Sequence, residues 1–117
     1  MADYSQITDS ILLSVKQLLG IAELDSVFDV DVIVGINAAL EVAHQIGIGD
    51  KSFFITGKSE TWTEFTSNEN LHNILKQYVY LKTRITFDPP TSGPLLESMK
   101  ENIKELEWRL SVSSSFQ

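Results

Sequence analysis

The 117-residue sequence contains no cysteine and only two histidines. Without thiols there is no disulfide framework, no thiolate nucleophile and no zinc–thiolate site, which suits a reducing compartment. His44 and His72 fall in different predicted helices, and neither is followed by an acidic residue four positions later. The paired spacing of metal-ligand motifs is therefore absent. We expect no metal site and no cofactor.

Long hydrophobic runs are also absent. Apolar runs such as Ile11–Leu13 and Val32–Val34 are short, whereas a membrane-spanning helix needs about 20 apolar residues. The first residues lack the basic and apolar regions of a signal peptide. We expect a protein that acts in the cytoplasm where it is made, or in something assembled there, with no membrane partner.

Catalytic motifs are absent as well. Gly47-Ile48-Gly49 is not followed by the Lys-Ser/Thr of a phosphate-binding loop, and no serine lies in a Gly-x-Ser-x-Gly elbow. Asp25, Asp29 and Asp31 are closely spaced, but their segment lacks the glycine and alternating oxygen ligands of an EF-hand loop. We interpret Asp25 or Asp29 as the cap of a following helix, and we expect no enzymatic activity.

The charge is strongly acidic and unevenly distributed. Nine Lys and Arg oppose 16 Asp and Glu, giving a net charge of −7. Residues 1–68 carry ten acids and three bases, whereas residues 69–117 carry six of each, so the first part holds the whole excess. Binding to DNA or RNA grooves needs clustered Lys and Arg, and anionic membranes attract the same residues. The composition therefore argues against both.

Apolar residues account for 43% of a chain long enough for one domain. They recur with helical spacing in four segments, which predicts an all-α, four-helix bundle-like domain over 1–117, with helices at about 5–19, 30–46, 68–87 and 93–111. The second helix has small apolar residues on its other face, so we expect it to be covered on two sides.

Several residues favour helix ends at these positions. Asp3, Ser5 or Thr8 can cap the first helix, Gly20 is suited to end it, and Gly47 or Gly49 is suited to end the second. Pro89-Pro90 ends the third helix, and Ser92 caps the fourth, whose narrow apolar seam predicts packing against one neighbouring helix. The seam consists of Leu96, Met99, Ile103, Leu106 and Leu110.

Two segments lack helical periodicity. Residues 50–66 contain two apolar runs around Thr56-Gly57-Lys58-Ser59, which favours a short β-hairpin or an ordered loop. Residues 111–117 are rich in serine and predict a flexible tail with one late aromatic residue, Phe116. The tail either docks on a partner or is a disordered end without a role.

Some aromatic residues lie off the predicted core stripes. Trp108 is two positions after Leu106 and faces away from the seam, and Tyr80 lies opposite Tyr78 on its helix. Trp and Tyr are enriched at binding hot spots. Such residues indicate an interface, unless the hairpin or the first helix covers them.

The order helix, helix, β-like loop, helix, Asp-Pro-Pro turn, helix resembles the small head–tail connector proteins of long-tailed bacteriophages, also called head-completion or adaptor proteins. The closest likeness is to versions from phages and prophages of Gram-positive bacteria, and it extends over nearly the whole chain. The stretches that carry it are Ile7–Gly20, Tyr78–Arg84, Phe87–Ser92 and Met99–Leu110.

The resemblance implies a structural virion protein without catalysis, at the head–tail junction, present in the host cytoplasm during assembly. It implies a homo-oligomeric ring, usually dodecameric, that binds beneath the portal after packaging, completes the head and receives the next neck or tail-completion protein. DNA would pass through the channel without sequence-specific binding. An acidic lumen would repel phosphate, and the residues expected to face it are Asp25, Asp29, Asp31, Glu60 and Glu64.

Ring neighbours meet through two different surfaces. We expect one contact on the third and fourth helices and a second at the 50–66 loop, with the tail docking on the portal. The interface residues expected from this interpretation are Trp62, Tyr80, Arg84, Trp108, Arg109 and Phe116. A rival hypothesis is a small acidic inhibitor that mimics DNA and binds a host nucleic-acid-binding protein.

Overall fold

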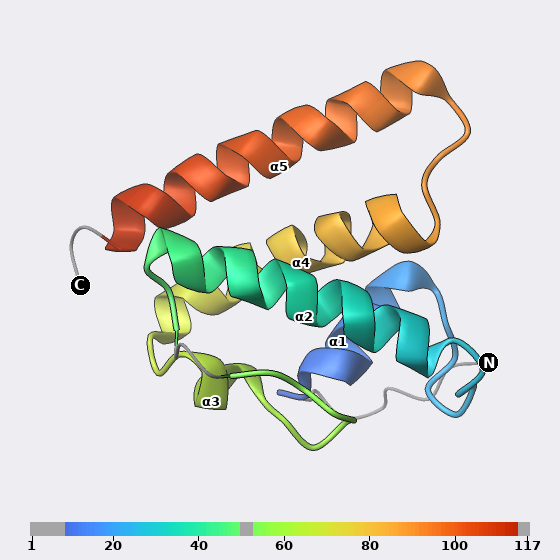
Figure 1. Ribbon diagram of the computed structural model, residues 1–117, viewed down its shortest axis with the longest axis horizontal. Helices are drawn as coiled ribbons and strands as arrows, with labels where there is room; N and C mark the ends of the chain where they lie inside the picture. The colour runs from blue at the N-terminus through green and yellow to red at the C-terminus, as the bar shows by residue number, and fades with distance from the viewer. Residues whose placement is uncertain (1–8, 50–52, 115–117) are drawn as a thin grey trace.

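A computed structural model describes residues 9–49 and 53–114 of the chain. Within these residues the fold is helical, without β-strands, which confirms the predicted all-α class. Five α-helices and one 3₁₀ turn follow one another in the order shown in Figure 1: α1 (Ile11–Leu19), α2 (Asp29–Ile46), α3 (Trp62–Phe65), η1 (Glu69–Leu71), α4 (His72–Phe87) and α5 (Gly93–Ser114).

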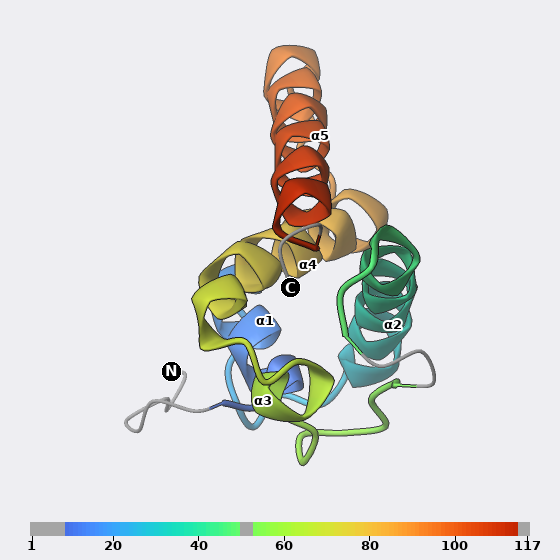
Figure 2. The same cartoon turned by 90° about the vertical axis from the view of Figure 1, so that its left-hand side faces the viewer.

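Four of the helices surround the interior, and α5 packs on them against α4 and α2. Figure 2 shows α1, α2, α3 and α4 arranged around the interior, with α5 on the far side of α4. Contributions to the core come from all five helices and from the loops, through Ile11, Val15, Ile36, Leu40, Ile48, Ile55, Trp62, Leu75, Tyr78 and Leu110 among others. In both views α5 is closest to α4 near its C-terminal end and diverges from it toward residue 93.

Helix α1 is shorter than the predicted 5–19. Residues 1–8, which include the three candidate caps, lie outside the described residues. The cap is Ser10, whose hydroxyl accepts from the Leu13 N–H at 3.2 Å. Ser10 has extended backbone and forms an isolated antiparallel bridge with Thr61, so the helix cannot begin before it. Gly20 ends the helix in the left-handed conformation, as predicted.

Helix α2 matches the predicted 30–46 closely, but its start is built differently. The residue before its first turn is Phe28, which makes no side-chain cap, and Asp29 is the first helical residue. The Asp25 carboxylate accepts from the Val27 N–H in the preceding loop. Neither aspartate is the helix cap, so that expectation is wrong. Gly47 ends the helix at a φ of 117°, as predicted.

The second apolar side of α2 is covered only in part by the described residues, since Ala39 is fully buried and Val42 is half-buried. Val32, Ile36 and Leu40 are buried against the core, whereas Val34 is 64% exposed and Ala38 is exposed. Gly35 lies at the closest approach to α4, since a Cβ there would be 3.0 Å from Thr83 Cγ2. The missing side chain therefore lets α2 and α4 pack tightly.

No hairpin forms in residues 53–66. The Asn37 side chain pairs with both backbone groups of Ile55, at 2.8 and 3.0 Å, and holds residues 53–55 along α2. The chain then turns into the four-residue helix α3, which begins with a capping box between Thr61 and Glu64. A helix start replaces the second strand of the predicted hairpin. Residues 50–52 lie outside the described residues.

Trp62 and Phe65 of α3 are both buried in the core. Trp62 is fully buried and its indole N–H donates to Ser14 Oγ at 3.2 Å. The Phe65 ring lies against Gly49, where a Cβ would come within 2.5 Å of it and where φ is +82°. Only glycine suits both conditions at position 49. The segment after α2 is therefore packed into the core by its aromatic residues.

Helices α4 and α5 confirm the two remaining helix predictions, with one correction at the end. The seam residues Met99, Ile103, Leu106 and Leu110 are buried. Helix α5 continues to Ser114, whose hydroxyl donates to the Ile46 carbonyl at 3.2 Å. Residues 111–114 are therefore helical rather than part of a flexible tail. Residues 115–117 lie outside the described residues.

Replacing Trp62 tests the importance of α3. Trp62→Ala should lower the free energy of unfolding by about 3–5 kcal/mol, since it leaves a large cavity and removes the partner of Ser14. The matched control is Trp108→Ala, because Trp108 is 66% exposed, and it should change stability by less than about 0.5 kcal/mol. Urea unfolding followed by circular dichroism measures both. Equal effects from the two variants would contradict the assignment of Trp62 to the core.

Candidate interaction surfaces

A buried lysine organises the loop between α1 and α2. The Lys16 side chain is 2% exposed, and its ammonium donates to the carbonyls of Glu23 at 3.0 Å and Asp25 at 2.8 Å. It also pairs with Asp29 Oδ1 at 2.9 Å. The ammonium therefore has two hydrogen-bonded carbonyls and one ion-pair partner. A single side chain from α1 therefore fixes the loop and the first residue of α2.

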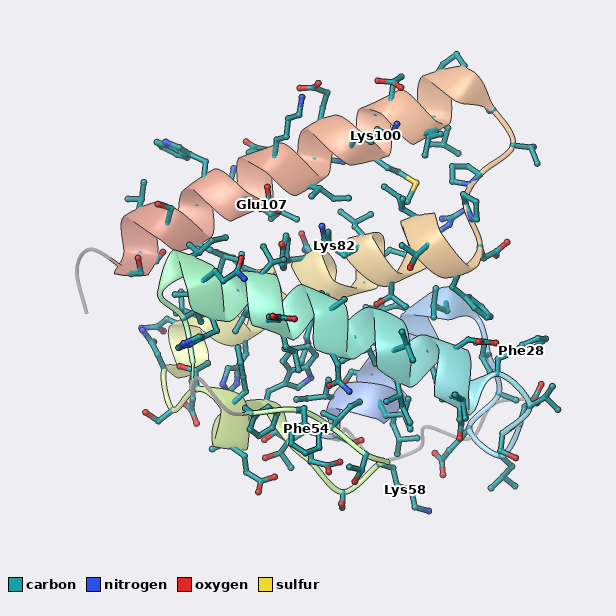
Figure 3. The ribbon with its side chains drawn as sticks, in the orientation of Figure 1. Phe28, Phe54, Lys58, Lys82, Lys100 and Glu107 are labelled. Carbon is teal, nitrogen blue, oxygen red and sulfur yellow. The ribbon has the colours of Figure 1, made fainter. Side chains whose placement is uncertain are left out.

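The same loop and the first turn of α2 present aliphatic side chains to solvent. Leu24 is 87% exposed, Val27 is 79% exposed and Val30 is 74% exposed. Phe28 is partly covered, because its ring packs edge-on against Phe87 of α4, with 5.4 Å between the ring centroids. We call residues 23–30 the knuckle. Figure 3 labels Phe28 at this end of the molecule.

A groove of about 650 Å³ follows the outward side of α2 along α4. Its α2 wall is mainly apolar, with Val34, Ala38 and Val42, and Phe28 and Phe87 lie at one end. Asp31 and Lys82 are its charged lining residues. The small side chains of α2 thus leave an apolar furrow on the surface.

A second hollow, of about 320 Å³, lies between α4 and α5, and we call it the cleft. Ile85 and Ile103 provide its apolar part, and Lys82, Lys100, Lys104 and Glu107 provide its charged part. Figure 3 shows Lys82 on α4 and Lys100 and Glu107 on α5, along the space between the two helices. The cleft is therefore locally basic in an acidic protein.

Glu107 is engaged from within the fold. Its carboxylate accepts from the Tyr78 hydroxyl at 2.8 Å. Burial of Tyr78, followed by this hydrogen bond and the charge of Glu107, raises the pKa of the phenol well above its usual range. Lys100 and Lys104 approach Glu97 and Glu101 only at 3.7 and 3.5 Å, on the exposed side of α5. Such exposed pairs are weak.

The expected channel-facing acids fall into two separate groups. Asp25 and Asp29 belong to the knuckle and Asp31 follows it. Asp25 and Asp31 are exposed, and Asp29 is paired with Lys16. Glu60 and Glu64 belong to the 53–66 segment, and each accepts hydrogen bonds close by in sequence. The carboxylate of Glu64 accepts from the Thr61 N–H at 2.9 Å. Each of the five acids has a place on or near the surface, but they do not form one cluster.

Glu60 closes the turn of residues 56–60. Its carboxylate accepts from the N–H and hydroxyl of Thr56, at 3.0 and 2.8 Å, and from the Gly57 N–H at 3.3 Å. Slight burial opposes ionisation, but these hydrogen bonds outweigh it and lower the pKa of Glu60 below its usual value. The ionised form is therefore the one that holds the turn.

The expected interface residues are not brought together on one surface. Trp62 is a core residue and offers no surface, and Phe116 lies outside the described residues. Tyr80 accepts from Arg84 Nη1 at 3.0 Å on α4. At 100° per residue, Tyr80 lies about 200° from Tyr78, which faces α5.

On α5, Trp108 likewise points away from α4, because it lies about 200° from the buried seam residue Leu106. Its neighbour Arg109 pairs with Glu105 at 3.2 Å. The Tyr80–Arg84 pair and the Trp108–Arg109 pair are thus on different sides of the two helices. They cannot serve as a single contact.

Sequence reasoning missed the knuckle, Lys16 and the basic cleft. One signal was available for the knuckle: residues 23–31 alternate acids with Leu24, Val27, Phe28 and Val30 outside any helical stripe. A second was the lone lysine in the apolar first helix. The cleft gave no signal, because its residues come from two helices whose divergence is a tertiary property.

Among residues 9–49 and 53–114, no group of three or more His, Cys, Asp or Glu side chains is arranged to hold a metal ion. Within the same part of the chain, no helix has both the length and the apolar character needed to cross a membrane.

Replacing Lys16 tests whether it holds the knuckle. Lys16→Met keeps the apolar stem but leaves Asp29 and two carbonyls without the ammonium, so the free energy of unfolding should fall by about 1–3 kcal/mol. Amide hydrogen exchange should accelerate in residues 21–29. Lys104→Met, at an exposed position, should change neither measurement. Unchanged exchange in the Lys16 variant would show that the loop is held by other means.

The pH dependence of stability tests Glu60. Because its pKa is lowered in the folded state, its stabilising contribution is complete above the unfolded pKa of about 4.3 and is lost as the pH falls through the folded pKa. Glu60→Gln should therefore lower the melting temperature at pH 7, and the difference from wild type should shrink below about pH 4. Glu41→Gln, at an exposed position on α2, is the control. A constant difference across this pH range is the contradicting result.

Comparison with protein-family models matches residues 11–117 to a family described as phage connector protein. The match includes every helix of the described structure. No curated protein and no solved structure matches the chain.

Proposed function

Because the chain belongs to the phage connector protein family, a structural role in the bacteriophage particle follows, and we propose that it forms a ring beneath the portal. The ring, a dodecamer as is usual for such proteins, completes the head after DNA packaging and receives the tail or the next neck protein. The observation that carries this proposal is the family match, which extends over nearly the whole chain.

The exposed surfaces of the single chain support assembly. Leu24, Val27 and Val30 are uncovered at the knuckle, and Trp108 is uncovered on the outer side of α5. Clustered exposed apolar residues on a soluble domain mark interaction sites. A ring needs two different complementary surfaces on each subunit, and the knuckle and the cleft differ in both shape and charge.

The acidic surface supports passage of DNA through the ring. Asp25 and Asp31 are exposed, and the carboxylates of Glu60 and Glu64 hold local hydrogen bonds at the surface. We propose that Asp31, Glu60 and Glu64 face the channel, where negative charge prevents phosphate from binding, whereas Asp25 and Asp29 belong to the knuckle. A ring whose lumen is lined mainly by Lys and Arg would contradict this part of the proposal.

The remaining contacts are assigned to the ends of the fold. The outer side of α5, with Trp108 and Arg109, and the Tyr80–Arg84 pair of α4 are two separate contact surfaces for neck proteins. The residues after Ser114, which include Phe116, are proposed to dock on the portal. A DNA-mimic inhibitor would need carboxylates along one exposed face, and the separation of the acids into two groups does not favour it.

The proposed function is tested by adding the purified chain to DNA-filled heads and to the purified portal of the same phage. Electron microscopy should show an added ring beneath the portal, and the heads should retain their DNA. Binding should be absent for capsids that lack the portal. Heads that retain DNA equally well without the chain, with no added ring, would disprove the proposal.

Removing residues 115–117 tests portal docking. The truncated chain should keep the helix content and melting temperature of the full chain, because the described fold ends at Ser114, but it should no longer bind the portal. Thr63→Ala, at an exposed position of α3, serves as a control that should still bind. Normal portal binding by the truncated chain is the contradicting outcome.

A further inference from the structure

The knuckle has the properties of a preorganised binding site. Its three most exposed aliphatic side chains, Leu24, Val27 and Val30, project from a backbone that Lys16 holds at two carbonyls. Surface loops with exposed apolar side chains usually lose freedom when they bind, which weakens binding. The buried ammonium removes much of that cost in advance, because the loop is already ordered.

The knuckle is also acidic. Glu23 and Asp25 flank Leu24, and the charge of Asp29 is balanced by Lys16. A partner for the knuckle must therefore offer an apolar hollow with positive charge around it.

The cleft between α4 and α5 offers that combination on the same chain. Ile85 and Ile103 form an apolar floor, and three lysines and one glutamate surround it. The Tyr78 hydroxyl already engages the glutamate, and Lys82 also lines the adjoining groove on α2. Its volume of about 320 Å³ is enough for aliphatic side chains of the size of Leu24 and Val27.

We propose that the knuckle of one copy docks in the α4–α5 cleft of the next copy, which is the contact that builds the proposed ring and rests on that function. The occupant is a second copy because the knuckle and the complementary cleft occur on one chain. They share no residue, so the contact is head-to-tail and leaves one knuckle and one cleft free at the ends of any open chain.

DNA is a less suitable occupant of the cleft. Phosphate binding needs clustered Lys and Arg, whereas here the floor is apolar and the lysines share the site with Glu107. Docking of the apolar, acidic knuckle uses both the apolar floor and the lysines of the cleft. It would also place Lys82, Lys100 and Lys104 away from the DNA that passes through the channel.

The absence of cysteine allows a direct cross-linking test. Val27→Cys and Lys104→Cys are made as separate single variants and treated with a short bismaleimide, alone and mixed, both free in solution and bound to the portal. The mixture should give a dimer, neither variant alone should, and a chain carrying both substitutions should give a ladder of higher oligomers. Val27→Cys mixed with Gln77→Cys, on another side of α4, is the matched control.

A charge exchange tests the complementarity. Asp25→Lys and Lys104→Glu should each reduce oligomer formation, measured by sedimentation velocity or on the portal, by about tenfold or more. The variant that carries both changes keeps the net charge of −7 and should recover most of the wild-type association. Circular dichroism confirms that each variant is folded.

The outcomes separate this inference from the proposed function. Portal binding without the Val27–Lys104 cross-link, or dimers formed by Val27→Cys alone, overturns the knuckle–cleft contact and leaves the connector role intact. A cross-link without portal binding supports the contact and removes the portal role. Lysine variants that assemble normally but change DNA retention would show that the cleft faces DNA, and would also overturn the proposal.

Discussion

The burial of one ammonium group shapes the end of the molecule that carries the knuckle. Lys16 is placed in the interior by the apolar helix α1, and its buried ammonium needs polar partners because an unpaired buried charge is costly. It finds them in two loop carbonyls and in Asp29. These contacts hold the loop next to α1 and to Asp29, where α2 begins. The aliphatic side chains Leu24 and Val27 of the loop are left exposed to solvent.

Helix α2 likewise has one side buried in the core and another side exposed to solvent. One side of the helix is buried in the core, and Gly35 allows close approach to α4. The outward side keeps Val34 and Ala38 exposed beside a groove. Helix α5 diverges from α4 (Figure 1) and opens the basic cleft. These surfaces are understandable if further copies or neck proteins cover them.

Helix positions were largely predictable, whereas the connections were not. Gly20, Gly47 and the two prolines marked real helix ends, because these residues act through local backbone geometry. Of the two alternatives expected for residues 50–66, the hairpin does not form in the described residues 53–66, since the capping box of Thr61 and Glu64 starts a helix and Trp62 is buried against α1. A Thr-x-x-Glu pattern was visible, but the apolar residues around it also fit strands.

The sequence by itself determined an acidic, cysteine-free, all-α domain with four main helices, and its pattern carried the likeness to the phage connectors. Composition and helical spacing are local properties, so they can be read without coordinates. Tertiary structure alone decided that Trp62 is buried, that Trp108 and Tyr80 face different sides, and that Lys16 supports an exposed knuckle. These features depend on which surfaces meet in space, and residues distant in sequence determine that together.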